Sequence, residues 1–146
     1  MLVNDAMNQF TLEFESSPYR LSGVVYGAML NDEAVLDAMG ERVVHPPYKG
    51  APSAPVLAIK PRNTLVGDGA VVVVPAGVEA LEIGASLGIV IGRTACRVPA
   101  ARALACVAGY TIVADLSVPQ ESHYRPAARF RVRDGFCPIH CSQVTS

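Results

Sequence analysis

Tyr124 and Arg125 are neighbouring side chains whose chemistry suits a small anionic substrate. An arginine fork pairs with both oxygens of a carboxylate, and a tyrosine hydroxyl adds a directional hydrogen bond. Lys60 ends an apolar, strand-like segment, where its ammonium could meet a substrate carboxylate. We therefore predict that these residues bind substrate and that a dicarboxylate would suit them. The sequence identifies no catalytic acid, base or nucleophile.

Structural roles stay open for the same side chains. Lys60 could be a solvent-facing lysine at a sheet edge, where charges discourage association between strands. Arg125 could bridge to Asp134 or Glu121 on the surface. The sequence alone does not decide between these roles and substrate binding.

The segment Cys137-Pro-Ile-His140-Cys141 carries thiol and imidazole groups, the usual ligands of tetrahedral zinc. A closed site would need a second ligand pair, and a helix-like segment separates Cys96 from Cys106. We therefore favour unrelated, reduced thiols over a zinc site. Four cysteines without an export signal are typical of a cytoplasmic protein.

Composition predicts one domain over residues 1–146. The chain is 51% hydrophobic and carries 12 basic and 13 acidic side chains, with no basic patch interleaved with aromatic residues. This balance argues against nucleic acid as a partner. Apolar runs such as Ala70 to Ala76 are far shorter than the roughly 20 residues of a membrane-spanning helix. Met1 to Ser17 contains acidic residues and does not resemble a signal peptide.

The elements that must position these side chains are mostly strands, because apolar residues alternate with a period of two between glycine and proline turns. The predicted strands are Gly23 to Leu30, Pro55 to Ile59, Ala70 to Val74, Ile83 to Ile91 and Tyr110 to Ala114.

Two helices are also predicted. The first follows Asn31 as a capping residue and stops at Gly40, and the second runs from near Pro99 to Gly109. Turns are expected at Gly67-Asp68-Gly69 and at Pro75-Ala76-Gly77.

Five segments carry a family resemblance, in their order as well as their residues. They are Ile59-Lys60-Pro61-Arg62-Asn63-Thr64, Val90-Ile91-Gly92-Arg93-Thr94-Ala95, Ala108-Gly109-Tyr110-Thr111, Tyr124-Arg125-Pro126-Ala127 and Arg133-Asp134-Gly135-Phe136-Cys137-Pro138-Ile139. Together they resemble the fumarylacetoacetate hydrolase superfamily. Within it, the chain is most similar to the N-terminal half of the bifunctional decarboxylases/isomerases of homoprotocatechuate (4-hydroxyphenylacetate) degradation.

The resemblance implies a mixed, mainly β roll with a few short helices around a pocket. It also implies Mg²⁺ or Mn²⁺ held by three carboxylates, which grips a 2-oxo acid. As a Lewis acid, such an ion stabilises the enolate that decarboxylation and isomerisation share. Residues 1–22 are then a variable N-terminal segment. Residues 140–146 depart from the family pattern, as if the domain were truncated at its C-terminus.

The resemblance also implies where the metal ligands would lie. The positions of two family glutamates fall on Gly84 and Ser86, and the position of an aspartate falls on Asp115. Glu82 shares the predicted metal-binding face, but a two-residue step along a strand is about 6.6 Å. Glu82 is therefore too far away to replace a ligand at position 84 unless the strand or the ion moves. A site of Glu82, Asp115 and Glu121 stays open as an alternative, as does Asp115 as a carboxylate in a hydrogen bond or ion pair. Arg131 stands where metal-bearing relatives carry lysine, and its guanidinium is unsuited to act as a base.

We therefore expect a subunit or half-domain without its own metal, in an assembly that acts on unsaturated 2-oxo di- or tricarboxylates. Its partner would be a homologous half that carries Mg²⁺ or Mn²⁺, or further copies of the chain. Two alternatives stay open: a self-sufficient, magnesium-dependent lyase/isomerase, and a non-catalytic structural or binding remnant. Open sheet edges at the tail predict that the isolated chain is oligomeric or aggregation-prone.

Overall fold

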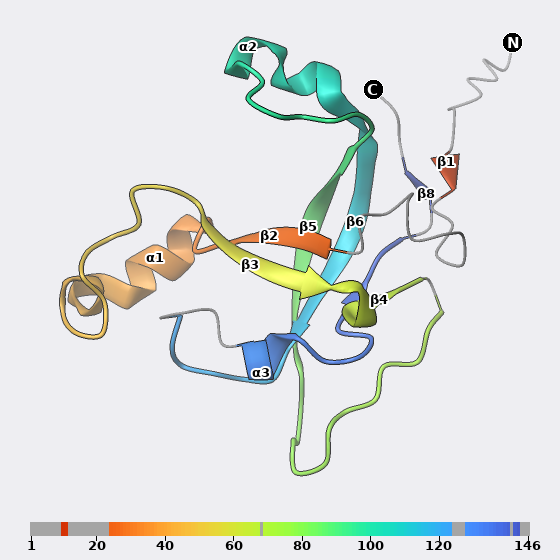
Figure 1. The fold of residues 1–146 in the computed structure, drawn as a ribbon. Coiled ribbons are helices and arrows are strands. Elements are labelled where there is room, and N and C mark those ends of the chain that lie inside the picture. The colour runs from red at the N-terminus through yellow and green to blue at the C-terminus, as the bar shows by residue number, and fades with distance from the viewer. Residues whose placement is uncertain (1–9, 12–23, 68, 124–127, 141, 144–146) are drawn as a thin grey trace, which may run out of the picture.

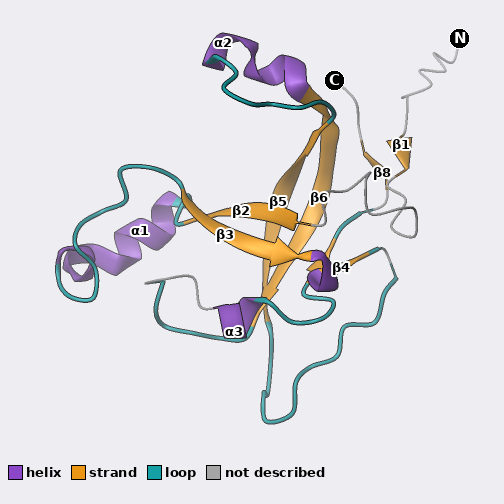
Figure 2. Cartoon of the chain, in the orientation of Figure 1, coloured by secondary structure: helices purple, strands orange, loops and turns teal. Residues whose placement is uncertain are grey.

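The structure, a computed structural model, describes residues 10–11, 24–67, 69–123, 128–140 and 142–143. Strands dominate, and three short α-helices lie at the outside (Figure 2). The strands are β1 (Phe10–Thr11), β2 (Val24–Met29), β3 (Val56–Pro61), β4 (Leu65–Val66), β5 (Glu82–Ile91), β6 (Val107–Ser117), β7 (Cys137–Pro138) and β8 (Ser142–Gln143). The helices are α1 (Glu33–Met39), α2 (Ala100–Ala103) and α3 (Ala128–Arg131), with 3-10 turns η1 (Gly40–Val44), η2 (Arg62–Thr64) and η3 (Leu104–Cys106).

Four two-stranded pairs make up the described sheets: β2 with β3, β5 with β6 and β1 with β8 are antiparallel, whereas β4 with β7 is parallel. The β5/β6 pair is the longest, and β2/β3 crosses it near the middle (Figure 1). A hydrogen bond from the Lys60 ammonium on β3 to the Leu116 carbonyl on β6 joins the two pairs. The prediction of a mainly β fold with a few short helices is confirmed.

The segment from Gly135 to His140 ties β6 to the region around β4. The Gly135 amide donates to Asn63 O, and the Ile139 amide donates to Val66 O. On its other side, the His140 amide donates to Ile112 O. The small core lies along this segment, where Val113, Cys137 and Ile139 pack together.

The two faces of β5/β6 differ in character, because directly opposed residues of an antiparallel pair project to the same side. Gly84 opposes Asp115 on one face. The other face carries large apolar side chains that are more than half exposed. They are Ile83, Leu87, Ile89 and Ile112. On β2/β3, Tyr26, Leu57 and Ile59 form a second exposed apolar group.

Four of the five predicted strands are confirmed as β2, β3, β5 and β6 with shifted ends. The predicted strand from Ala70 to Val74 is wrong, because this segment pairs with no other described strand and leaves Val71 and Val73 largely exposed. The first helix is capped by Asp32 and not by Asn31, since the Asp32 carboxylate accepts from the Ala34 amide at 2.8 Å. Gly40 ends that helix as predicted, with φ of 50°.

The predicted second helix, from near Pro99 to Gly109, is too long. Only α2 and η3 are helical, and β6 has begun by Val107. The β-branched Val107 suits an extended strand, and the segment from Val107 onward pairs with β5. Long-range pairing therefore overrides the local apolar pattern.

Gly88 gives a test of the β5/β6 packing. A Cβ atom at Gly88 would lie 2.8 Å from the Cγ2 atoms of both Thr111 and Val113, whereas one at Gly27 would meet no atom within 4 Å. Because both neighbours are stiff β-branched residues, Gly88→Ala is expected to lower the free energy of unfolding by about 1–3 kcal/mol. The matched Gly27→Ala variant should be neutral or stabilised. Urea unfolding of both variants checks this, and equal stability of the two would contradict the described packing.

Candidate functional site

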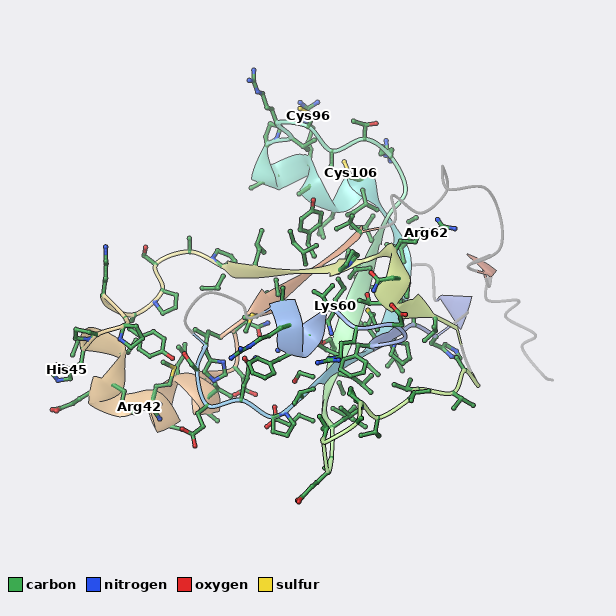
Figure 3. The ribbon with its side chains drawn as sticks, turned by 60° about the horizontal axis from the view of Figure 1, so that its bottom comes forward. Arg42, His45, Lys60, Arg62, Cys96 and Cys106 are labelled. Atoms are coloured by element: carbon green, nitrogen blue, oxygen red, sulfur yellow. The ribbon has the colours of Figure 1, made fainter. Side chains whose placement is uncertain are left out.

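Lys60 lies at the centre of the molecule and not on an exposed edge (Figure 3). Alternation on β3 places it on the same buried face as Ala58, and the residue is only 3% exposed. Its Nζ atom donates to the carbonyl oxygens of Leu116 at 2.7 Å, Phe136 at 3.0 Å and Arg131 at 3.1 Å. The alternative of a solvent-facing lysine is therefore wrong.

Asp115 is the anion of this cluster. Its Oδ1 atom lies 2.7 Å from Lys60 Nζ, and its Oδ2 atom accepts a hydrogen bond from Arg131 Nη2. Lys60 comes from β3, Asp115 from β6 and Arg131 from the end of α3. The expected alternative, Asp115 as a carboxylate in an ion pair, is what the structure shows. We call these three side chains the ion cluster.

Burial dominates the electrostatics of Lys60. Desolvation lowers the pKa of its ammonium below the ordinary 10.5, and the hydrogen bond and charge of Asp115 act in the opposite direction. Arg131 adds a smaller downward contribution to that pKa because it is a like charge. The Asp115 carboxylate is therefore what keeps a buried cation acceptable at this point.

The residues around Asp115 do not fit a divalent cation. Gly84, directly opposite, has no side chain, and Ser86 opposes the apolar Val113. Both oxygens of Asp115 already face cationic groups. Two unit charges 4 Å apart at a protein surface repel by about 4 kcal/mol, so a further cation here would be opposed by both neighbours.

The alternative three-carboxylate site is wrong. Glu82 Oε2 accepts a long hydrogen bond of 3.5 Å from Ser117 Oγ, and Glu121 lines a hollow beside α1. Among residues 24–67, 69–123 and 128–140, no three His, Cys, Asp or Glu side chains come close enough to share a metal ion.

Two of the predicted substrate-binding residues, Tyr124 and Arg125, lie outside the described residues. Their roles stay predictions. Asp134, which was considered as a partner of Arg125, accepts a hydrogen bond from Asn63 Nδ2 at 2.8 Å. For Lys60, the geometry favours a structural role over substrate binding, because four oxygens already surround its three N–H donors.

The three cysteines that the structure describes do not form one group. Cys137 is fully buried in the core, Cys106 is buried near α2, and Cys96 is exposed beside it (Figure 3). Cys141, the other thiol of the predicted zinc motif, lies outside the described residues, so that alternative is not tested.

A separate hollow of about 320 Å³ lies between α1 and the segment that follows β6. Arg42, Tyr48, Glu121 and His123 contribute polar groups to its lining, and the His123 amide donates to the Tyr48 hydroxyl at 3.0 Å. Figure 3 shows Arg42 on the α1 side of the molecule, away from Lys60. The hollow is therefore distinct from the ion cluster.

Sequence reasoning missed that Arg131 is the second counterion of Asp115. Arg131 was considered only as an unsuitable base. One signal was available for the burial of Lys60: the period of two places it on the same face of its strand as the small, apolar Ala58. No sequence pattern places Arg131 beside Lys60 or Asp115. The contact between Arg131 and Asp115 depends on the packing of α3 against β6.

Cys137 predicts a measurable pH dependence of stability. Burial raises the pKa of its thiol from 9.0 to about 11, and the nearby Lys60 acts in the opposite direction. Between pH 9 and about 11 the unfolded chain therefore releases a proton that the folded chain retains. The stabilisation from this thiol is fully present below pH 9 and is lost as the pH rises toward 11.

Urea unfolding across that pH range checks the prediction. The unsubstituted chain should lose more stability with rising pH than Cys137→Ala does. The exposed Cys96 supplies the control, because Cys96→Ala should keep the slope of the unsubstituted chain. Equal slopes for the unsubstituted chain and Cys137→Ala would contradict the assignment.

Across the described part of the chain, no helix has the length and apolar character needed to cross a membrane. The helices that position the site are all far shorter than that.

Comparison with known proteins gives the family. Residues 24–145 match the fumarylacetoacetate (FAA) hydrolase C-terminal family. The chain is 41% identical over 119 residues to the 4-hydroxyphenylacetate degradation bifunctional isomerase/decarboxylase of Escherichia coli, which covers 82% of this chain and 28% of that protein. The chain thus spans little more than a quarter of this relative.

Solved structures agree with the fold. The 5-carboxymethyl-2-hydroxymuconate delta-isomerase of Mycobacterium smegmatis matches with a TM-score of 0.56 and 35% identity, over 66% of this chain and 39% of that one. Fumarylpyruvate hydrolase from Pseudomonas aeruginosa, solved with Mn²⁺ and pyruvate, matches with a TM-score of 0.51 and 22% identity, over 60% of this chain and 42% of that one. At that identity the second likeness supports the fold alone. The match across residues 24–145, the sequence identity and the shared fold together show that this chain belongs to the fumarylacetoacetate hydrolase family.

Proposed function

We propose that this chain is the non-metal subunit or half of a decarboxylase/isomerase that acts on unsaturated 2-oxo di- or tricarboxylates in 4-hydroxyphenylacetate catabolism. One observation carries the proposal: Gly84 faces Asp115, and that carboxylate is held by Lys60 and Arg131. The reaction class comes from the relatives, since the E. coli protein is an isomerase/decarboxylase and the M. smegmatis protein is an isomerase.

The partner in this proposal is a homologous chain that carries the two glutamates and binds Mg²⁺ or Mn²⁺. Two features support it. The relative in E. coli is a much longer bifunctional protein, so sequence like this one occurs next to further sequence in one chain. The exposed apolar faces of β2/β3 and β5/β6 are also of the kind that a neighbouring domain covers. A cytoplasmic location is part of the proposal.

Mixing tests the proposed function. The purified chain is combined with a homologous chain that carries the glutamate pair, and turnover of an unsaturated 2-oxo dicarboxylate is followed by its ultraviolet absorbance with Mg²⁺ present. We expect no turnover by this chain alone, formation of a complex on size exclusion, and turnover by the mixture above that of the metal-bearing chain alone. Magnesium-dependent turnover by the purified chain alone, abolished by Asp115→Ala, would instead establish the self-sufficient enzyme.

Self-association of the isolated chain follows from the exposed face of β5/β6. Leu87 is 69% exposed on that face, beside its cross-strand partner Ile112. We expect light scattering to show oligomers, and Leu87→Lys to shift the population toward monomer because it places a charge on the contact surface. Val71→Lys is the matched control, since Val71 is 88% exposed but lies outside every described strand. A monomeric unsubstituted chain, or equal effects of the two variants, would contradict this prediction.

A further inference from the structure

We infer that Lys60 and Arg131 take the electrostatic place of a divalent cation, so that the ion cluster is a metal-independent centre. The inference rests on the part of the proposed function that gives the chain no metal of its own. It does not depend on the partner or the substrate.

The charges of the cluster match those of a cation site. Lys60 and Arg131 together bring two positive charges to one carboxylate, which is the formal charge of one Mg²⁺ or Mn²⁺ ion. Each cation addresses a different oxygen of Asp115. Because each oxygen already lies beside a cationic nitrogen, an added metal ion would be repelled by two fixed positive charges.

The contacts of Lys60 also join separate elements of the fold, as a bound metal ion would. A cation with oxygen ligands joins the elements that supply them. The Lys60 ammonium likewise gathers oxygens from separate places: Asp115 and Leu116 of β6, Arg131 at the end of α3 and Phe136 just before β7. One buried point charge thus holds β3 against three other parts of the fold.

Space is not what excludes a metal here. A Cβ atom at Gly84 would lie 3.7 Å from Asp115 O and 3.9 Å from Asp115 Cβ, which are ordinary contact distances. A Cβ atom at Gly84 would therefore fit beside Asp115 without a clash. Two changes are then needed to create a metal site: anionic groups must be added on β5, and at least one internal cation must be removed.

The experiment separates these two requirements. The substitutions Gly84→Glu and Ser86→Glu are introduced together, once in the unsubstituted chain and once with Arg131→Gln. Arg131→Gln removes one charge but does not alter the three carbonyl groups that accept from Lys60, so we expect the fold to be retained. Binding of Mn²⁺ is measured from the electron paramagnetic resonance signal of the free ion. The matched control carries glutamines in place of the introduced glutamates.

We expect Mn²⁺ to bind at least about tenfold more tightly in the Arg131→Gln background, because a like charge beside the ion has been removed. The glutamine controls should bind no Mn²⁺ in either background, and EDTA should leave the melting temperature of the unsubstituted chain unchanged. Equal behaviour of the two glutamate variants, including no binding in either, would overturn the inference. A fall in melting temperature with EDTA would also overturn it. Because no assay of turnover or partner binding is involved, these outcomes are independent of the mixing experiment.

Discussion

Lys60→Met is expected to lower the free energy of unfolding by about 3 kcal/mol or more, the effect of removing one partner of a buried ion pair. Methionine keeps most of the side-chain volume but donates no hydrogen bond. The carbonyl oxygens of Leu116, Arg131 and Phe136 would each lose a donor in a buried setting. For a chain of this size the melting temperature should fall by about 10 °C.

Lys49→Met is the control for this substitution. Lys49 is exposed, so the same chemical change there should leave stability within about 0.5 kcal/mol of the unsubstituted chain. Chemical unfolding and thermal melts of both variants supply the comparison. If Lys60→Met is as stable as Lys49→Met, Lys60 does not hold the fold together and the description of the ion cluster is wrong.

Phe136→Ala should cost about 3–5 kcal/mol, as expected when a fully buried aromatic side chain is truncated. Phe136 is 0% exposed, and its backbone carbonyl accepts from both the Lys60 ammonium and the Leu116 amide. The cavity left by the ring would lie next to those bonds. We therefore expect partial loosening of the ion cluster in addition to the loss of stability.

Phe130→Ala is the matched truncation. Phe130 is only half-buried, and its ring stacks beneath the Arg129 guanidinium at 4.5 Å. Loss of the contact between Arg129 and the Phe130 ring should lower the free energy of unfolding by only about 1 kcal/mol. The loss of the small apolar area that Phe130 buries adds to this. Urea unfolding distinguishes the two substitutions. A cost for Phe136→Ala no greater than that for Phe130→Ala would show that the core does not lie where the structure places it.

The sequence predicted the long, alternating elements of the fold well. β2, β3, β5 and β6 each present one apolar face, and that period of two is visible without any structure. The two-residue strands β4 and β7 carry no such period, because they are too short and form only through parallel pairing between Leu65 and Cys137. The strand predicted around Val71 is absent because the segment has the composition of a strand but pairs with no described strand.

The candidate site was predictable only in part. The absence of carboxylates at Gly84 and Ser86 follows directly from the sequence once the family resemblance is recognised. Gly84 lies opposite Asp115 because of the register between β5 and β6. The hydrophobic pattern of each strand does not determine that register to the exact residue. The roles of Lys60 and Arg131 as counterions depend on three separate elements meeting at one point. Such a meeting has no local signature in the sequence.

The centre of this fold is built from internal charges. In this chain the ammonium of Lys60 connects β3, β6, α3 and the segment before β7, and Asp115 balances its charge. Under the proposed function, such a chain would fold without a metal and would leave the chemistry of the 2-oxo acid to a metal-bearing homologue. The stability of the fold and the reaction of the proposed assembly would then be separate functions of separate chains or halves.

The metal content of the purified chain tests whether the ion cluster excludes a metal ion. The chain is expressed with supplementary Mg²⁺ and Mn²⁺, purified without chelator and analysed by elemental mass spectrometry, followed by titration with Mn²⁺. A metal-independent ion cluster predicts no stoichiometric metal before the titration and no saturable binding of Mn²⁺ during it. One Mg²⁺ or Mn²⁺ ion bound per chain, and released by Asp115→Ala, would contradict it.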